Sequence, residues 1–161
     1  IEVLPAYLRY SRPGPGQPTI PRMLDDMMAL RRSLIRDIIR MVAPRMPAGG
    51  TAAARAALAR AWAVRDEALT FRREDFAIMR AIVEAASFLP AVWTLNRLSG
   101  VYLDIASMIT GTFRPPDDYL EAHDRLFLAL EANDAEAAPA IIAEYLDRHD
   151  AKLLAVLGVM Q

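Results

Sequence analysis

Hydrophobic residues recur every three to four positions along almost the whole chain from Ile20 onward, which is the spacing of helices that turn one face toward a core. No run alternates apolar and polar residues between turn signals, as a half-buried strand would. The pattern predicts an all-α fold, an antiparallel bundle of about six helices. The expected helices run from about Pro21 to before Pro44, from Thr51 to about Asp66, from about Thr70 to Ser87, from Leu89 to about Thr112, from about Asp117 to Ala132 and from Asp134 to about Leu157.

Local signals refine this division of the chain. Thr51 and Asp134 are predicted N-caps, because their side-chain oxygens can accept the first free backbone N–H groups of a helix. The helix from Leu89 is apolar on nearly every face, which predicts a place in the middle of the bundle. Residues 1–19 hold four prolines and two glycines and are predicted to be a Pro/Gly-rich linker, with residues 20–161 as one helical domain.

Composition narrows the possible functions. The chain has 161 residues, no cysteine, and 19 basic against 20 acidic side chains, for a net charge of -1. That length can bury a core without disulfides or a structural metal, and the missing thiols exclude a cysteine nucleophile or zinc–thiolate site and fit a reducing cytoplasm. The charge balance argues against nucleic-acid binding by this chain alone, and charges interrupt every long apolar stretch, so no membrane span is expected.

Several polar residues share the register of an apolar stripe and are expected to point inward. They are Arg31, Asp75, His123, Tyr145 and His149. A buried arginine needs a carboxylate opposite, supplied by Asp75 or by a ligand. An internal cavity with an anionic ligand accounts for the whole set, while polar residues that merely satisfy one another remain the structural alternative. The remaining arginines of the pairs at 31–32 and 72–73 are expected to be solvated helix edges.

Other chemistry has weaker support in the sequence. His123 and Tyr145 are 22 residues apart and with Asp75 resemble a metal cluster that lacks a nitrogen ligand. Met79 would have to fill the gap, and a thioether is a poor ligand for hard divalent ions, so neither a tight metal nor another cofactor is expected. Tyr145 and His149 could relay a proton in principle, but no hydrolase, kinase or protease motif accompanies them, and we expect no enzyme.

Three blocks of residues resemble the C-terminal effector domain of the FadR-type GntR transcription regulators, over about residues 21–154, with the fatty-acid-responsive branch as the nearest match. The first block is Asp75-Phe76-Ala77-Ile78-Met79-Arg80, Ala86-Ser87, Leu95-Asn96, Leu98, Gly100, Val101-Tyr102 and Ile105. The second is Pro21, Asp25, Leu30-Arg31 and Arg40, and the third is His123, Leu126 and Tyr145.

The resemblance implies a site and a ligand. Most of the family carries an aspartate and three histidines that hold a divalent metal for small carboxylates; Asp75 and His123 match, whereas Met79 and Tyr145 replace two histidines. The fatty-acid-responsive branch binds long-chain acyl-CoA, and Tyr102 and Tyr145 match tyrosines that line its ligand site. The implied effector pocket comprises Arg31, Asp75, Met79, Tyr102, His123 and Tyr145. Its ligand would be an acyl-CoA or fatty-acid-like molecule; the alternatives are a metal-assisted sensor of a small organic acid and a purely structural dimerisation module.

The same resemblance implies partners and a mechanism. The domain would form a homodimer in the cytoplasm and would reach DNA only through a winged helix-turn-helix domain absent from this chain, with residues 1–19 as the linker from it. A ligand that prefers one arrangement of the helices would shift the population of the dimer and so change the placement of two DNA-binding heads.

Overall fold

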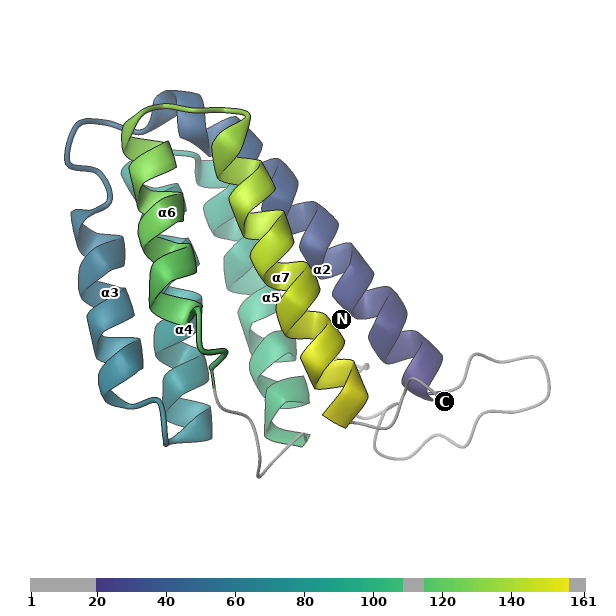
Figure 1. Cartoon of the computed structure of the whole chain (residues 1–161). Coiled ribbons are helices and arrows are strands. Elements are labelled where there is room, and N and C mark those ends of the chain that lie inside the picture. Colours follow the sequence, from purple (N-terminus) through teal and green to yellow (C-terminus); the bar gives the residue numbers. More distant parts are fainter. Residues whose placement is uncertain (1–19, 109–114, 157–161) are drawn as a thin grey trace.

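The computed structural model describes residues 20–108 and 115–156, which are helical almost throughout (Figure 1). Within these ranges no strand occurs, and the elements are α2 (Ile20–Val42), the 3-10 turn η1 (Ala43–Arg45), α3 (Ala52–Ala63), α4 (Ala68–Ala85), α5 (Leu89–Met108), α6 (Tyr119–Glu131) and α7 (Ala137–Val156). The all-α prediction is confirmed, and each expected helix is present. The expected linker at residues 1–19 and the predicted helical residues 109–112 lie outside the described ranges.

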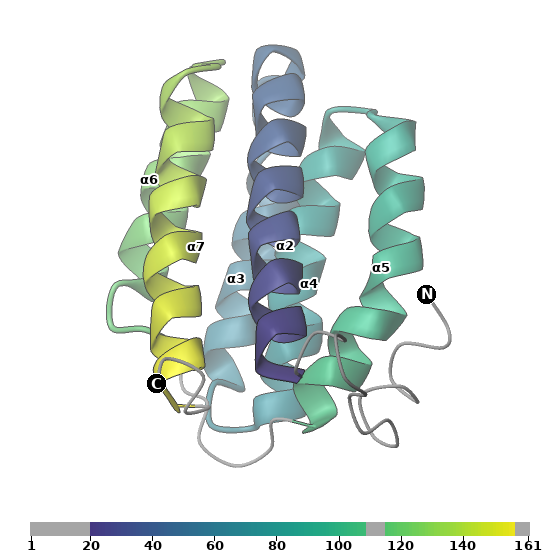
Figure 2. The same ribbon diagram turned by 90° about the vertical axis from the view of Figure 1, so that its right-hand side faces the viewer.

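Two helix pairs form most of the bundle. Helix α3 packs against α4, and α2 packs against α7, with α6 beside α7 (Figures 1 and 2). Small side chains allow α3 to approach α4 closely, since Ala54, Ala57 and Ala61 are almost fully buried. The larger side chains of the core come from every layer, and the most buried of them include Ile39, Val42, Ile82, Val83, Tyr119, Leu126, Phe127 and Leu130.

Helix α5 does not lie in the middle of the bundle, and that prediction is wrong. It packs chiefly against α4 and stands at one edge, as Figure 2 shows. Leu89 and Trp93 on this helix are 57% and 65% exposed. An apolar surface on all sides indicates burial only if the same chain covers every side, and in the described part of this chain one side of α5 remains open.

Two helices end in the same left-handed turn. Ser87 and Asn133 have positive φ angles of 53° and 54°, and each directly follows the C-cap residue of a helix, Ala86 of α4 or Ala132 of α6. The next residue in each case, Phe88 or Asp134, donates its N–H to a carbonyl one turn back, which closes a Schellman motif. Asn133 adds two side-chain hydrogen bonds, to the carbonyls of Ala43 at 2.8 Å and Met46 at 2.9 Å, so the turn before α7 is tied to η1 and the residue after it.

The two predicted N-caps have different outcomes. Asp134 is a cap: its carboxylate accepts hydrogen bonds from the N–H groups of Ala137 at 2.8 Å and Glu136 at 3.0 Å, and these bonds lower the pKa of the aspartate. Thr51 stands before α3 without a side-chain capping bond. Its hydroxyl instead donates to the carboxylate of Glu131 on α6 and lowers the pKa of that group, so it links two helices.

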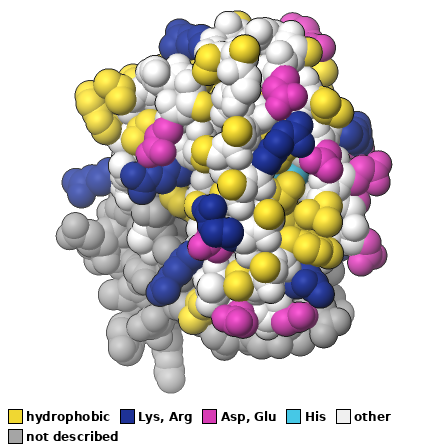
Figure 3. Space-filling model, turned by 90° about the vertical axis from the view of Figure 1, so that its left-hand side faces the viewer, with side chains coloured by type: hydrophobic (Ala, Val, Ile, Leu, Met, Phe, Trp, Pro, Cys, Tyr) yellow, Lys and Arg dark blue, Asp and Glu magenta, His cyan; other side chains and the backbone are white. Residues whose placement is uncertain are grey.

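The surface over α3 and α6 mixes the two signs of charge. In Figure 3 basic and acidic side chains alternate over this face, and a histidine is just visible among hydrophobic groups. Arg55 illustrates the mixture, because it pairs with Asp124 at 3.0 Å and with Glu131 at 3.4 Å.

Among the described helices, none combines the length and hydrophobicity that a bilayer crossing requires.

Candidate functional site

A group of polar and aromatic side chains lies in the interior between α4, α6 and α7. We refer to Arg72, Tyr119, His123, Tyr145 and His149 as the polar cluster; each is less than 10% exposed. The ring centroids of Tyr119 and His123 are 4.5 Å apart, those of His123 and Tyr145 are 5.2 Å apart, and those of Tyr145 and His149 are 5.8 Å apart. The inward direction expected for His123, Tyr145 and His149 is therefore found in the structure.

The backbone fixes the orientation of His123. Its Nδ1 lies 2.7 Å from the carbonyl oxygen of Tyr119, one turn earlier on α6. Because a carbonyl oxygen only accepts, Nδ1 carries the hydrogen and donates it. In the neutral ring, Nε2 is therefore the nitrogen with a lone pair, available to accept a hydrogen bond.

His149 is uncharged at neutral pH. Burial lowers the pKa of His149 to about 3, and the positive charges of Arg31 and Arg72 add to the effect. A second proton on this imidazole would have to be accommodated away from water and close to two guanidinium groups, which is unfavourable. The cluster thus places neutral, polarisable rings beside fixed positive charges, a combination that suits an anionic group.

Arg31 and Asp75 do not face one another, contrary to one of the two expectations for the partner of this arginine. Asp75 instead accepts a hydrogen bond from the Tyr119 hydroxyl at 2.8 Å. Arg31 reaches across to α7, where its Nη2 lies 2.5 Å from Oδ1 of Asp150. The requirement for a buried carboxylate was predicted correctly, but a different residue provides it.

Asp150 is the main residue that the sequence reasoning missed. Its carboxylate is fully buried, and Oδ2 also accepts from Nη1 of Arg32 at 3.0 Å. Burial raises the pKa of Asp150, whereas the charges and hydrogen bonds of the two arginines act against that rise. A signal was present in the sequence, because Ile142, Leu146 and Asp150 follow at four-residue spacing on one helix face.

Arg72 corrects a second expectation. It is only 4% exposed and is not a solvated helix edge, whereas its neighbour Arg73 is exposed. Phe71, Arg72 and Asp75 occupy adjacent positions on the inner face of α4, so Arg72 shares the stripe that the apolar spacing defines. The sequence pattern did not single out Tyr119, whose hydroxyl contacts Asp75.

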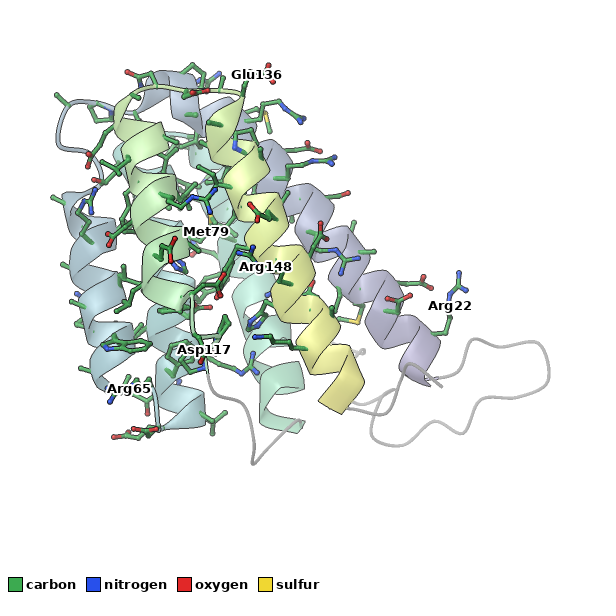
Figure 4. The ribbon with its side chains drawn as sticks, viewed as in Figure 1. Arg22, Arg65, Met79, Asp117, Glu136 and Arg148 are labelled. Carbon is green, nitrogen blue, oxygen red and sulfur yellow. The ribbon has the colours of Figure 1, made fainter. Side chains whose placement is uncertain are left out.

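The two other expected site residues are Met79 and Tyr102. Met79 is half-buried on α4 and packs against the core at mid-height of the bundle (Figure 4). Tyr102 belongs to α5, but its side chain lies outside the described part of the structure. Of the six predicted pocket residues, the structure brings His123 and Tyr145 into contact and holds Asp75 next to them through Tyr119. It pairs Arg31 with Asp150, which follows His149 on α7.

The metal site typical of the resembled family does not fit these residues. The described side chains include no group of three or more His, Cys, Asp or Glu placed to hold an ion. The carboxylate of Asp75 accepts the Tyr119 hydroxyl, and Met79 and Tyr145 offer a thioether and a phenol where imidazoles would be needed.

The described helices form an all-α bundle with arginine, histidine and tyrosine side chains gathered in its interior. A family model, the FCD domain, matches residues 26–148, and the chain belongs to this family of C-terminal effector domains of GntR-type transcription regulators. No curated protein and no solved structure matches the chain. The family is regulatory and effector-binding rather than enzymatic.

Proposed function

We propose that this effector domain senses an acyl-CoA or fatty-acid-like ligand whose acidic head group lies against the polar cluster. The observation that carries the proposal is the position of His149, a buried neutral imidazole flanked by the charges of Arg31 and Arg72. An anionic group beside these arginines is stabilised by charge-assisted hydrogen bonds. Met79 and the aromatic rings nearby provide the apolar, adaptable surface that an acyl chain requires.

A small organic acid is the second candidate, and one observation favours it. The rings of the polar cluster are close together, with centroids 4.5 to 6.3 Å apart, so the polar surface is compact. Such a surface suits a ligand with several acidic groups near one another. If the ligand is a small organic acid, it binds directly to arginine and tyrosine side chains, because the ligand set for a metal is not assembled.

Thermal unfolding with a ligand panel tests both candidates. The panel contains oleoyl-CoA, oleic acid and citrate. A ligand that binds only the folded domain stabilises it by about 2.7 kcal/mol at 100 times its dissociation constant, which corresponds to several degrees in melting temperature. The first candidate requires the largest shift with oleoyl-CoA or oleic acid. A larger shift with citrate would select the second, and no shift with any ligand would favour the dimerisation module.

Two tyrosine variants test the location of the ligand. Tyr145→Phe should reduce the ligand-induced shift in melting temperature, because the Tyr145 hydroxyl is expected to bind the head group. Tyr119→Phe is the matched control, since its hydroxyl is committed to Asp75 at 2.8 Å and its loss should lower the unliganded stability instead. The location would be wrong if both variants changed only the unliganded melt.

The assembly state belongs to the same proposal. We place the homodimer contact on the open sides of α2 and α5, where Leu30 is 70% exposed and Trp93 is 65% exposed.

In the complete regulator, which acts in the cytoplasm, DNA would be contacted by a winged helix-turn-helix domain outside this chain. Native mass spectrometry should therefore show a dimer, and a duplex-binding assay with this chain alone, whose net charge is -1, should show no retention.

A further inference from the structure

The contact between α2 and α7 is built around one buried carboxylate. Asp150 is fully buried, and each of its oxygens accepts from a different guanidinium, Arg31 at 2.5 Å and Arg32 at 3.0 Å. We call Arg31, Arg32 and Asp150 the clasp. Arg32 also pairs with the exposed Asp147 at 3.1 Å. Because Asp150 has two arginine partners, its carboxylate remains paired with Arg32 when Arg31 changes its partner.

The clasp lies next to the part of α2 in which few described side chains are buried. Toward its carboxyl end α2 is anchored by Ile38, Ile39 and Val42, which are at most 3% exposed. Among the described side chains from 22 to 30, Met28 alone is buried. In Figure 1 the amino end of α2 and the carboxyl end of α7 point away from α3 and α6. Residues 25–30 of α2 therefore depend on the clasp more than on the core.

The clasp also borders the polar cluster. His149 directly precedes Asp150 on α7, and its ring stacks on Tyr145 with a centroid distance of 5.8 Å and an interplanar angle of 25°. The side chain of Arg31 is 19% exposed, so it is neither free in water nor locked in the core. An anionic group that enters beside His149 would attract Arg31 from the other side.

We propose that the clasp is a switch that couples the polar cluster to α2, and that Arg31 exchanges its partner Asp150 for the anionic group of a bound ligand. The inference rests on the proposed function for the ligand, a carboxylate or phosphate-bearing molecule. Arg32 keeps Asp150 paired while Arg31 moves, so no buried charge is abandoned. Release of one of the two links loosens the amino-terminal half of α2. By thermodynamic linkage, a change that loosens the clasp also strengthens ligand binding.

Hydrogen–deuterium exchange of the whole chain without ligand tests the first half of the proposal. Asp150→Asn should raise the exchange rate of residues 20–32 by about tenfold, with a smaller change in residues 36–45. Asp147→Asn is the matched control, because Asp147 lies on the same helix and pairs with Arg32 at 3.1 Å but is 68% exposed. Equal exchange in the two variants would overturn the clasp as the hold on α2.

Binding measurements with oleoyl-CoA and citrate test the partner exchange. Asp150→Asn releases Arg31 and should tighten binding by about tenfold, whereas Arg31→Gln should weaken it by a similar factor. Affinities within twofold of the unaltered chain in both variants would overturn the exchange. If no variant binds either probe while Asp150→Asn still loosens residues 20–32, the proposed ligand class and the exchange both fail, and the clasp stands.

Arg31→Gln also covers the case in which Asp150→Asn does not fold. This variant leaves Asp150 paired with Arg32, so the domain should still unfold cooperatively, with residues 20–32 exchanging faster than in Asp147→Asn. Unchanged exchange in Arg31→Gln would then overturn the clasp by itself.

Discussion

Helices α3 and α4 meet through alanine side chains, whereas α2 and α7 meet across charged ones. Ala57 and Ala61 are at most 1% exposed in the first contact, and Asp150 is 0% exposed in the second. Apolar packing is insensitive to the charge of a ligand, while a buried ion pair responds to any new charge nearby. The comparison indicates a rigid half of the bundle and an electrostatically adjustable half.

The largest expected effect comes from removing the carboxylate of the adjustable half. Asp150→Ala leaves two guanidinium groups without their shared counter-charge and should lower the free energy of unfolding by about 3 to 5 kcal/mol. Chemical denaturation measures it. Asp147→Ala, at the exposed end of the same contact, should cost less than about 1 kcal/mol. Similar losses for both would mean that the buried carboxylate stabilises this contact no more than the exposed one does.

Acid should weaken the adjustable half through His149. The pKa of this group is about 3 in the folded domain against an ordinary 6.5, so the unfolded chain takes up the proton first as the pH falls. Its contribution is complete above about pH 6.5 and decreases toward pH 3, by up to about 1.4 kcal/mol per pH unit. Urea unfolding at several pH values measures the slope. In His149→Phe the slope should be smaller; an identical slope would contradict the assignment.

The rigid half should resist enlargement. Ala57→Leu adds volume to the close contact between α3 and α4 and should cost about 1 to 3 kcal/mol. The control is Ala59→Leu, since Ala59 is exposed on the same helix and its replacement should be nearly neutral. Thermal melts compare the two. If Ala57→Leu were as well tolerated as the control, the contact between α3 and α4 would be less tightly packed than the burial of Ala57 indicates.

The smallest expected changes in stability come from glycine substitutions in the two left-handed turns, and they should have opposite signs. Ser87→Gly relieves a non-glycine residue with φ of 53° and should stabilise the domain by about 1 kcal/mol or less. Asn133→Gly should instead destabilise it, because Asn133 donates side-chain hydrogen bonds to two carbonyls. If both variants shifted the melting temperature in the same direction, backbone strain at Ser87 and the side-chain hydrogen bonds of Asn133 would not be what distinguishes the two turns.

The helices and the inward-facing polar residues were predictable because both depend on local spacing. His123 and Tyr145 stand on apolar stripes, and the sequence alone places them inside. Asp150 was not predicted, because both it and His149 fit the inner face of α7 within the rotation that periodicity allows. The true partner of Arg31 depends on how two helices distant in sequence are aligned, which spacing within one helix does not determine.

The sequence pattern also did not predict how much of a whole helix is buried. Helix α5 is apolar enough for the centre, yet Trp93 is 65% exposed, because the place of a helix depends on which neighbours cover it. Arg72 shows the reverse error: a charged residue next to another was assigned to the surface, although its position on α4 turns it inward.

The stacking of Trp62 on Tyr119, with ring centroids 6.1 Å apart and planes 14° from parallel, gives the domain an intrinsic optical reporter. The chain has two tryptophans, and in Trp93→Phe all indole emission would come from Trp62. Tyr119 also contacts His123 and Tyr145, so a molecule that displaces these rings alters the surroundings of the indole. Events in the interior can thus be followed as a change in emission colour or intensity, without any added dye.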